Sequence, residues 1–239
     1  MGFAHVQGVV KNNASPGTTM SIVLGSAPVT GHMVCVGAIV FGVASAFTVK
    51  DANNNSYTLT TNSPGVLDSR TIVLAYLLNA PANASATINV SWTTSLTADG
   101  FADEFSVSGG TAAFDKDAAI ANGSAGTNVN TPTITPAGSN ELLYSVCRDS
   151  GSITSPSAGA TQGVWTGGGG GISTNGSDAE YDLSASSATA VNYTQSPSGS
   201  TWDCMAMAFS FSPAASTFDD DGFQAVQIPP LDTAVSIYR

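Results

Sequence analysis

The sequence is most informative at Phe47-Thr-Val-Lys-Asp-Ala-Asn-Asn-Asn-Ser-Tyr-Thr-Leu59, where two alternating apolar and polar runs enclose a cluster of turn-forming residues. Such alternation is typical of β-strands, because successive side chains of a strand point to opposite faces. Asp and Asn at the centre favour a tight turn. This stretch therefore predicts a β-hairpin, and we expect the fold to be organised around it.

Strand-like runs lie on the N-terminal side of the hairpin. The run Met33-Val-Cys-Val-Gly-Ala-Ile-Val-Phe41 is apolar throughout, which fits a central strand that is covered on both faces. Phe3 to Val10 and Thr18 to Leu24 are separated by the turn-forming residues 12–17. We expect these two runs to form an N-terminal hairpin.

The pattern restarts in the second half of the chain, where Thr131 to Val146 echoes Ser26 to Val36. Two similar passes of short strands suit a single large antiparallel β-sandwich of the jelly-roll type, in which each pass contributes to both sheets. The sequence therefore predicts an all-β fold. We expect the sandwich domain to cover residues 1–212 and an extended C-terminal arm to cover residues 213–239.

The composition restricts the classes of partner. Six basic residues against 17 acidic ones give a net charge of −11, which argues against binding to nucleic acid through its phosphates. No apolar run approaches the roughly 20 residues of a membrane-spanning helix. Charged residues make up only 10% of the chain, and Ser, Thr, Asn and Gly are abundant. We expect a hydroxyl-rich acidic surface, with neither nucleic acid nor a membrane as partner.

The three cysteines, Cys35, Cys147 and Cys204, all lie in apolar runs that read as strands. Their number is odd and their spacing does not match a metal site. Buried free thiols are favoured over one disulfide with a spare thiol.

Two groups of polar residues are candidate cation sites. Asp51-Ala-Asn-Asn-Asn55 resembles the start of a calcium loop, but the distal Glu and the glycine of that motif are missing, so an Asn-rich turn is favoured. Asp178, Glu180 and Asp182 alternate along one strand and share a face. They could hold a cation or perform acid/base chemistry, but a solvated outer face is favoured.

The remaining motifs do not point to catalysis. His5 and His32 lack a Ser, Cys or Asp at the spacing of a catalytic triad. The run Gly167-Gly-Gly-Gly-Gly171 lacks the Lys-Ser/Thr ending of a phosphate-binding loop, and a flexible hairpin tip is the favoured interpretation. We expect no catalytic residue, no metal and no cofactor.

The C-terminal arm combines an acidic and Pro-rich spacer with an apolar ending. An apolar ending is costly in water unless it docks, either on a neighbouring subunit by strand addition or across its own sandwich. Both alternatives remain open. The residues expected to dock are Phe218, Phe223, Ile228, Pro229, Pro230, Leu231, Val235, Ile237 and Tyr238.

Five segments occur in a characteristic order: Val29-Thr-Gly-His-Met-Val-Cys-Val36, the hairpin Phe47–Leu59, Ala75-Tyr76, Asp103-Glu-Phe-Ser-Val-Ser-Gly109 and Pro136-Ala-Gly-Ser-Asn-Glu-Leu-Leu143. This order resembles a loose family of jelly-roll-like β-sandwich proteins with the pattern "aGdLlvv…vtDsaGNtYt…Y…aEysG…agdLlv". Such proteins occur among tailed-bacteriophage virion and tail proteins and among bacterial surface proteins. The chain departs from the pattern at Asn54, where the family has Gly, and at His32, where it has an acidic residue.

The resemblance implies a non-enzymatic structural protein at the virion surface, either a capsid decoration or a tail component. Its partners would be other virion proteins and further copies of itself. The alternative is a carbohydrate-binding module or receptor-binding adhesin, extracellular or on a bacterial surface, which would stack a glycan on Trp165 or Tyr193. Trp92 and Trp202 are expected in the core. A hydrolase would require two close carboxylates or a metal in a cleft.

Overall fold

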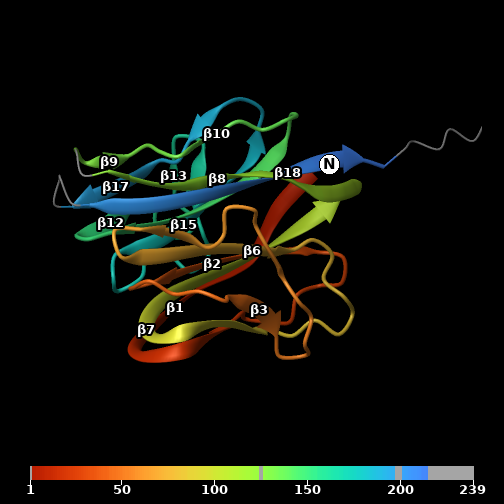
Figure 1. Cartoon of the computed structure of the whole chain (residues 1–239). Coiled ribbons are helices and arrows are strands. Elements are labelled where there is room, and N and C mark those ends of the chain that lie inside the picture. Colours follow the sequence, from red (N-terminus) through yellow and green to blue (C-terminus); the bar gives the residue numbers. More distant parts are fainter. Residues whose placement is uncertain (1, 124–125, 197–200, 215–239) are drawn as a thin grey trace, which may run out of the picture.

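The computed structural model describes residues 2–123, 126–196 and 201–214, and the regular elements in these ranges are all β-strands (Figure 1). The named strands pair antiparallel, which confirms the predicted all-β antiparallel fold. The described strand pairs each lie within residues 2–108 or within residues 110–213. We refer to these parts as the N-terminal half and the C-terminal half.

The N-terminal half forms one seven-stranded sheet of order β1-β7-β2-β6-β4, with β3 on β7 and β5 on β6. Its strands are β1 (Gly2–Val23), β2 (Met33–Val40), β3 (Thr48–Asp51), β4 (Thr58–Leu59), β5 (Gly65–Leu67), β6 (Arg70–Leu77) and β7 (Thr87–Ser108).

Strand β2 is the central strand that its apolar sequence predicts. Every residue from Met33 to Val40 is buried. Val34 and Val36 point into a first core inside the N-terminal half, while Met33 and Cys35 point into a second core between the halves. A strand with apolar side chains on both faces must be covered on both faces. The first and the second core provide these two covers.

Strands β1 and β7 are each 22 residues long, and the two ends of each strand belong to different layers of the sheet. The first residues of β7 pair with β3 and with the end of β1, whereas its later residues pair with β2 and with the start of β1. The expected N-terminal hairpin is therefore wrong. The turn-forming residues 12–17 instead produce register shifts between Asn13 and Thr19 inside one continuous strand, where the ribbon passes from one layer to the other.

The predicted turn at Asp51 is confirmed, although the hairpin is short. The Asp51 carboxylate accepts hydrogen bonds from the backbone of Asn53, Asn55 and Ser85 and from the Asn55 amide. Burial acts to raise the pKa of Asp51, but these four hydrogen bonds outweigh it and lower the pKa. After one bridge between Lys50 and Ser56, the chain leaves β3 and pairs with β6 as β4.

The C-terminal half forms a six-stranded sheet, β13-β14-β15-β11-β18-β8, covered by the three-stranded sheet β12-β17-β9 and the pair β10-β16. Its strands are β8 (Gly110–Gly123), β9 (Asn128–Val129), β10 (Thr133–Ile134), β11 (Glu141–Asp149), β12 (Ser152–Ser155), β13 (Thr161–Gln162), β14 (Trp165–Gly167), β15 (Ser177–Ala185), β16 (Thr189–Ala190), β17 (Tyr193–Ser196) and β18 (Trp202–Pro213).

The two large sheets pack face to face, with the N-terminal half below and the C-terminal half above in Figure 1. The second core between them contains Phe101 and Phe105 from below and Tyr144, Met207 and Phe209 from above. A third core fills the C-terminal half. The two large sheets thus pack as the predicted β-sandwich. Each pass builds its own sheets, however, so the expectation that each pass contributes strands to both sheets is wrong. Strands β2 and β11 both bury residues on two faces, and the molecule accordingly contains three cores.

A disulfide joins Cys147 of β11 to Cys204 of β18, and Cys35 remains a buried free thiol. The expectation of three free thiols is wrong. The two cysteines lie 57 residues apart in the chain, but antiparallel pairing places them directly opposite each other, with their side chains on the same face of the sheet.

Candidate functional site: the seam between the halves

The two aromatic residues expected to bind a glycan are buried in the third core. Trp165 is 1% exposed, and its indole Nε1 donates to the carbonyl of Ala190 over 2.8 Å. Tyr193 is fully buried. The expected exposure of Trp165 is therefore wrong, because β14 packs against β15 and the cover of the third core encloses the ring. Neither ring offers a face for stacking.

The residues expected to dock in the C-terminal arm, from Phe218 to Tyr238, lie outside the described ranges. The chain is described as far as Ala214, whose backbone N donates to the carbonyl of Gly109 over 2.9 Å. Gly109 follows Ser108, which pairs with Gly2 at the start of β1. Nearby, the rings of Phe3 and Phe211 pack edge to face with centroids 6.0 Å apart. The last described residue, Ala214, thus lies beside the start of β1.

The acidic residues of β15 are buried inside the C-terminal half, so the favoured interpretation of a solvated outer face is wrong. Asp178 and Glu180 are fully buried. Glu180 Oε1 accepts a hydrogen bond from the backbone of Asn192 over 2.9 Å, beside the covering strand β17. Burial raises the pKa of Asp178 to about 8 and that of Glu180 well above its usual value. Burial also raises the pKa of Asp182.

Asp103 of β7 is the centre of the polar contacts across the seam. Its carboxyl group accepts hydrogen bonds from the Tyr144 hydroxyl over 3.0 Å and from the backbone of Gly169 over 2.8 Å. His5 Nε2 lies 2.9 Å from the same group. The His5 ring also stacks on Tyr181 of β15, with centroids 4.8 Å apart. One buried side chain of the N-terminal half thus fixes two segments of the C-terminal half.

Asp99 makes a similar set of contacts four residues earlier on β7, on the same face of the strand. Its carboxylate accepts from the Ser173 hydroxyl and from the Asn175 amide, both over 2.7 Å. The backbone of Thr174 donates to Asn12 of β1 over 3.0 Å. The loop between β14 and β15 is therefore tied to the N-terminal half at three successive residues.

The glycine run lies in this loop and packs on β1. A Cβ on Gly170 would lie 2.0 Å from the backbone N of Val10, and a Cβ on Gly169 would lie 2.6 Å from Gly8. The absence of side chains at Gly8, Gly169 and Gly170 permits this approach of the two backbones. The interpretation of the run as a flexible hairpin tip is therefore wrong, because the glycines serve close packing between distant segments.

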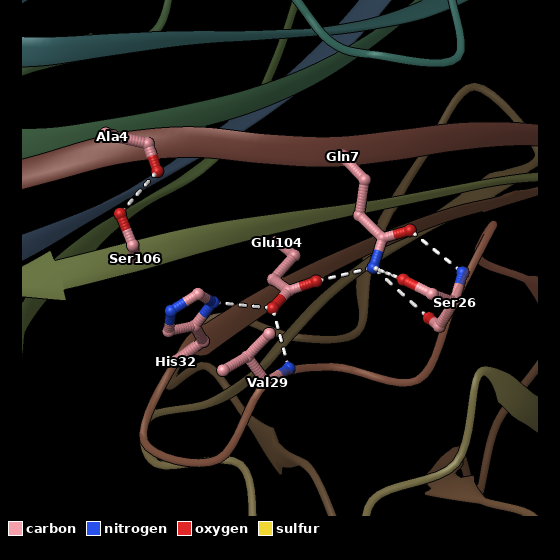
Figure 2. A network of polar contacts seen from close by, with 7 residues as sticks. All are labelled: Ala4, Gln7, Ser26, Val29, His32, Glu104 and Ser106. Carbon is pink, nitrogen blue, oxygen red and sulfur yellow. Dashed lines mark hydrogen bonds and ion pairs between the residues drawn. The ribbon is translucent and has the colours of Figure 1, made fainter.

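Glu104 follows Asp103 and points to the opposite face of β7, where it holds the loop between β1 and β2 (Figure 2). Its carboxylate accepts from His32 Nδ1 over 2.6 Å and from the backbone of Val29 over 2.8 Å. The Gln7 amide donates to it over 2.5 Å and also contacts Ser26. His32 thus supplies a hydrogen-bond partner for a buried carboxyl group.

These contacts give both histidines a structural role. The hydrogen bonds described for His5 and His32 go to carboxyl groups, whereas general-base activation would require a nucleophile within reach. In the described ranges, no pocket is detected and no group of three or more His, Cys, Asp or Glu side chains is arranged to hold a metal. The described part of the chain also contains no helix suited to crossing a membrane.

The outer edge of β1 is the other notable feature beside the seam. Strand β1 pairs with β7 on one side and has no second strand partner among the described residues. Gln7 to Asn13 pair with Glu104 to Ala98 without interruption. Val6 stands at a register shift and is 45% exposed. An edge strand of this length presents free backbone donors and acceptors.

No family model and no curated protein matches the sequence. Among solved structures, the chain is similar to the STIV MCP, with a TM-score of 0.26 and 6% identity over 85% of this chain and 97% of that chain. It is also similar to the major capsid protein P2 of bacteriophage PM2, with a TM-score of 0.23 and 7% identity over 90% and 98% of the two chains. Similarity at these TM-scores carries no argument about function.

Proposed function

We propose that the chain is a non-enzymatic structural protein of a tailed-phage virion, either a capsid decoration or a tail component. In this role the two halves act as one rigid body that is displayed at the particle surface, and residues 213–239 dock on a neighbouring virion protein. The single observation that carries the proposal is that buried carboxyl groups hold segments of the chain together through internal hydrogen bonds. Asp99, Asp103 and Glu104 all engage in internal hydrogen bonds that fasten segments to the body.

A structural role requires that the two halves of the protein keep a fixed arrangement. Hydrogen bonds to buried carboxyl groups are costly to break, because a buried partner would be left unsatisfied. The second core adds a continuous apolar contact between the large sheets, including Phe105 stacked edge to face on Tyr181 with centroids 5.3 Å apart. These contacts oppose hinge motion between the halves. The order of the family motifs in the sequence supports the same proposal.

The surface also suits a displayed protein. The net charge of −11 favours solubility and opposes binding to nucleic acid or anionic membranes. The glycan-binding alternative has no such support, since Trp165 and Tyr193 are both buried.

The proposal is tested by mass spectrometry of purified virions of the phage whose genome encodes this sequence. We expect peptides of the chain in the particles at a constant ratio to the major capsid protein. A chain truncated after Ala214 should fold, as judged by its thermal unfolding, but should be lost from the particles. Particles that lack the full-length polypeptide would overturn the virion role, and particles that retain the truncated chain would overturn docking through the arm.

A further inference from the structure

We propose that the free edge of β1 is the docking site for the C-terminal segment 231–238 of a second copy of the chain, which adds to the sheet as a further strand. The inference rests on the docking role proposed for the arm, and it names the surface and the partner. Strand addition satisfies the backbone groups of an open edge and takes its affinity from main-chain hydrogen bonds.

The acceptor is the stretch Gln7–Asn13 of β1. Its inner side forms an uninterrupted register with β7, so its backbone is held in the extended conformation that a new strand requires. No other described strand covers its outer side. The loop that contains Gly169 and Gly170 packs against this stretch, yet no backbone hydrogen bond between loop and strand is found among the described residues. This stretch is therefore held in place, and within the described part of the chain its outward main-chain groups have no backbone hydrogen-bond partner.

The donor is the apolar ending of the arm. In Leu231-Asp-Thr-Ala-Val-Ser-Ile-Tyr238, Thr233, Val235 and Ile237 alternate with Ala234, Ser236 and Tyr238. β-Branched residues on one face with smaller or aromatic residues on the other are typical of a strand that is buried on one side. The segment contains no proline, so each residue can donate a hydrogen bond to a partner strand.

The length of the arm allows its ending to reach a second copy. The last described residue lies beside the start of β1, since Ala214 contacts Gly109 and Ser108 pairs with Gly2. The 16 residues 215–230 can span up to about 55 Å when extended. The edge from Gly2 to Asn13 is only roughly 40 Å long. An extended spacer would therefore be long enough to pass the end of its own edge and to deliver the ending to a neighbour. Repetition of this head-to-tail contact would build a ring or a chain, and a reciprocal exchange would build a dimer.

Crosslinking between two separately produced variants tests the inference. In a Cys35→Ala background, one variant carries Lys11→Cys on the β1 edge and the other carries Val235→Cys in the arm. The two are mixed and treated with a bismaleimide whose reach covers several residues of register. A covalent heterodimer is expected. The matched control is Lys50→Cys, an exposed lysine on β3, which should give no heterodimer with the arm variant.

Each other outcome overturns the inference. If a crosslink forms only within a chain that carries both Lys11→Cys and Val235→Cys, the arm occupies its own edge. If Lys50→Cys crosslinks equally well, the contact is non-specific. If no crosslink forms, the edge is not the acceptor. The result is separable from the proposed function: particles that contain the protein without this crosslink would overturn the acceptor alone, and particles without the protein would overturn the virion role.

A proline scan provides a second readout. Val235→Pro removes one backbone donor from the added strand, whereas Asp220→Pro places the same change in the spacer as a matched control. Hydrogen exchange of residues 7–13 should be slow in the full-length chain at high concentration, at least tenfold faster with Val235→Pro, and slow again with Asp220→Pro. Equal protection in the two proline variants would overturn strand addition by this segment.

Discussion

Tyr144 and Asp103 join the two halves of the molecule across the second core. The Tyr144 hydroxyl of β11 donates to Asp103 Oδ2 of β7 over 3.0 Å, and both side chains are buried. Burial raises the pKa of Tyr144, and the negative charge of Asp103 raises it further, so the phenol keeps its proton and remains a donor over the whole physiological range. A polar contact in a low-dielectric interior is worth more than the same contact at the surface.

Tyr144→Phe should therefore destabilise the protein. It removes one donor from a buried carboxyl group and should lower the free energy of unfolding by about 2 kcal/mol, as measured by urea denaturation. Tyr57→Phe is the matched control, because the buried Tyr57 hydroxyl has no hydrogen-bond partner among the described residues. That variant should be neutral or slightly stabilising. Equal losses in the two variants would show that the Tyr144 contact adds nothing to the seam.

Gly170→Ala tests the close packing of the loop on β1. A Cβ at this position would meet the backbone N of Val10 at 2.0 Å, and a backbone cannot yield as a flexible side chain does. Overpacking of this kind costs about 1–3 kcal/mol, so the midpoint of thermal unfolding should fall. Gly25→Ala is the control, because its new Cβ would make only an ordinary contact with the Gln7 amide at 3.4 Å. A change in Gly25→Ala as large as that in Gly170→Ala would contradict the tight contact.

The sequence predicts the strands better than it predicts their partners. The all-β class, the two-faced burial of β2 and the turn at Asp51 follow from local alternation and turn chemistry, and they are confirmed. The glycine run is misread for a physical reason: whether Gly170 is a flexible tip or a packing surface depends on Val10, 160 residues earlier in the chain. Local composition contains no information about that approach.

The burial of Asp178 and Trp165 has a similar explanation. The sequence shows that Asp178 and Glu180 share one face of a strand, but it does not show what covers that face. The cover consists of β9, β12 and β17, which are two to four residues long, too short for a periodic signal. The disulfide likewise depends on the register between β11 and β18, which the spacing of the cysteines does not encode.

The disulfide predicts a dependence on redox conditions. A crosslink that closes a loop of 57 residues stabilises by about 4 kcal/mol if it acts by restricting the unfolded chain. Thermal unfolding in reducing buffer should therefore occur at a clearly lower temperature than in oxidising buffer. A thiol titration of the unfolded, unreduced chain should find one reactive thiol, that of Cys35. Three reactive thiols would contradict the Cys147–Cys204 bond.

Asp178 predicts a stability that falls as the pH rises. Burial raises its pKa in the folded state to about 8, whereas an unfolded Asp titrates near about 3.9. The contribution of Asp178 to the free energy of unfolding is fully present below its unfolded pKa and is lost as the pH rises to its folded pKa. The reason is that, between these two pKa values, the carboxyl group is ionised in the unfolded chain but still protonated in the folded chain. The free energy of unfolding should fall between pH 5 and pH 8, with a slope of at most about 1.4 kcal/mol per pH unit from this group.

Asp178→Asn isolates this slope, since the amide cannot ionise. Relative to the parent chain, the variant should gain stability progressively from pH 5 to pH 8. Asp51→Asn is the opposite control: the pKa of Asp51 is lowered by its hydrogen bonds, so its stabilisation is present above the unfolded pKa and is lost toward acid. That variant should be destabilised at pH 7, by an amount that shrinks below about pH 4. A difference between Asp178→Asn and the parent that does not change from pH 5 to pH 8 would mean that the carboxyl group titrates normally and that the cover of the third core does not exclude water from it.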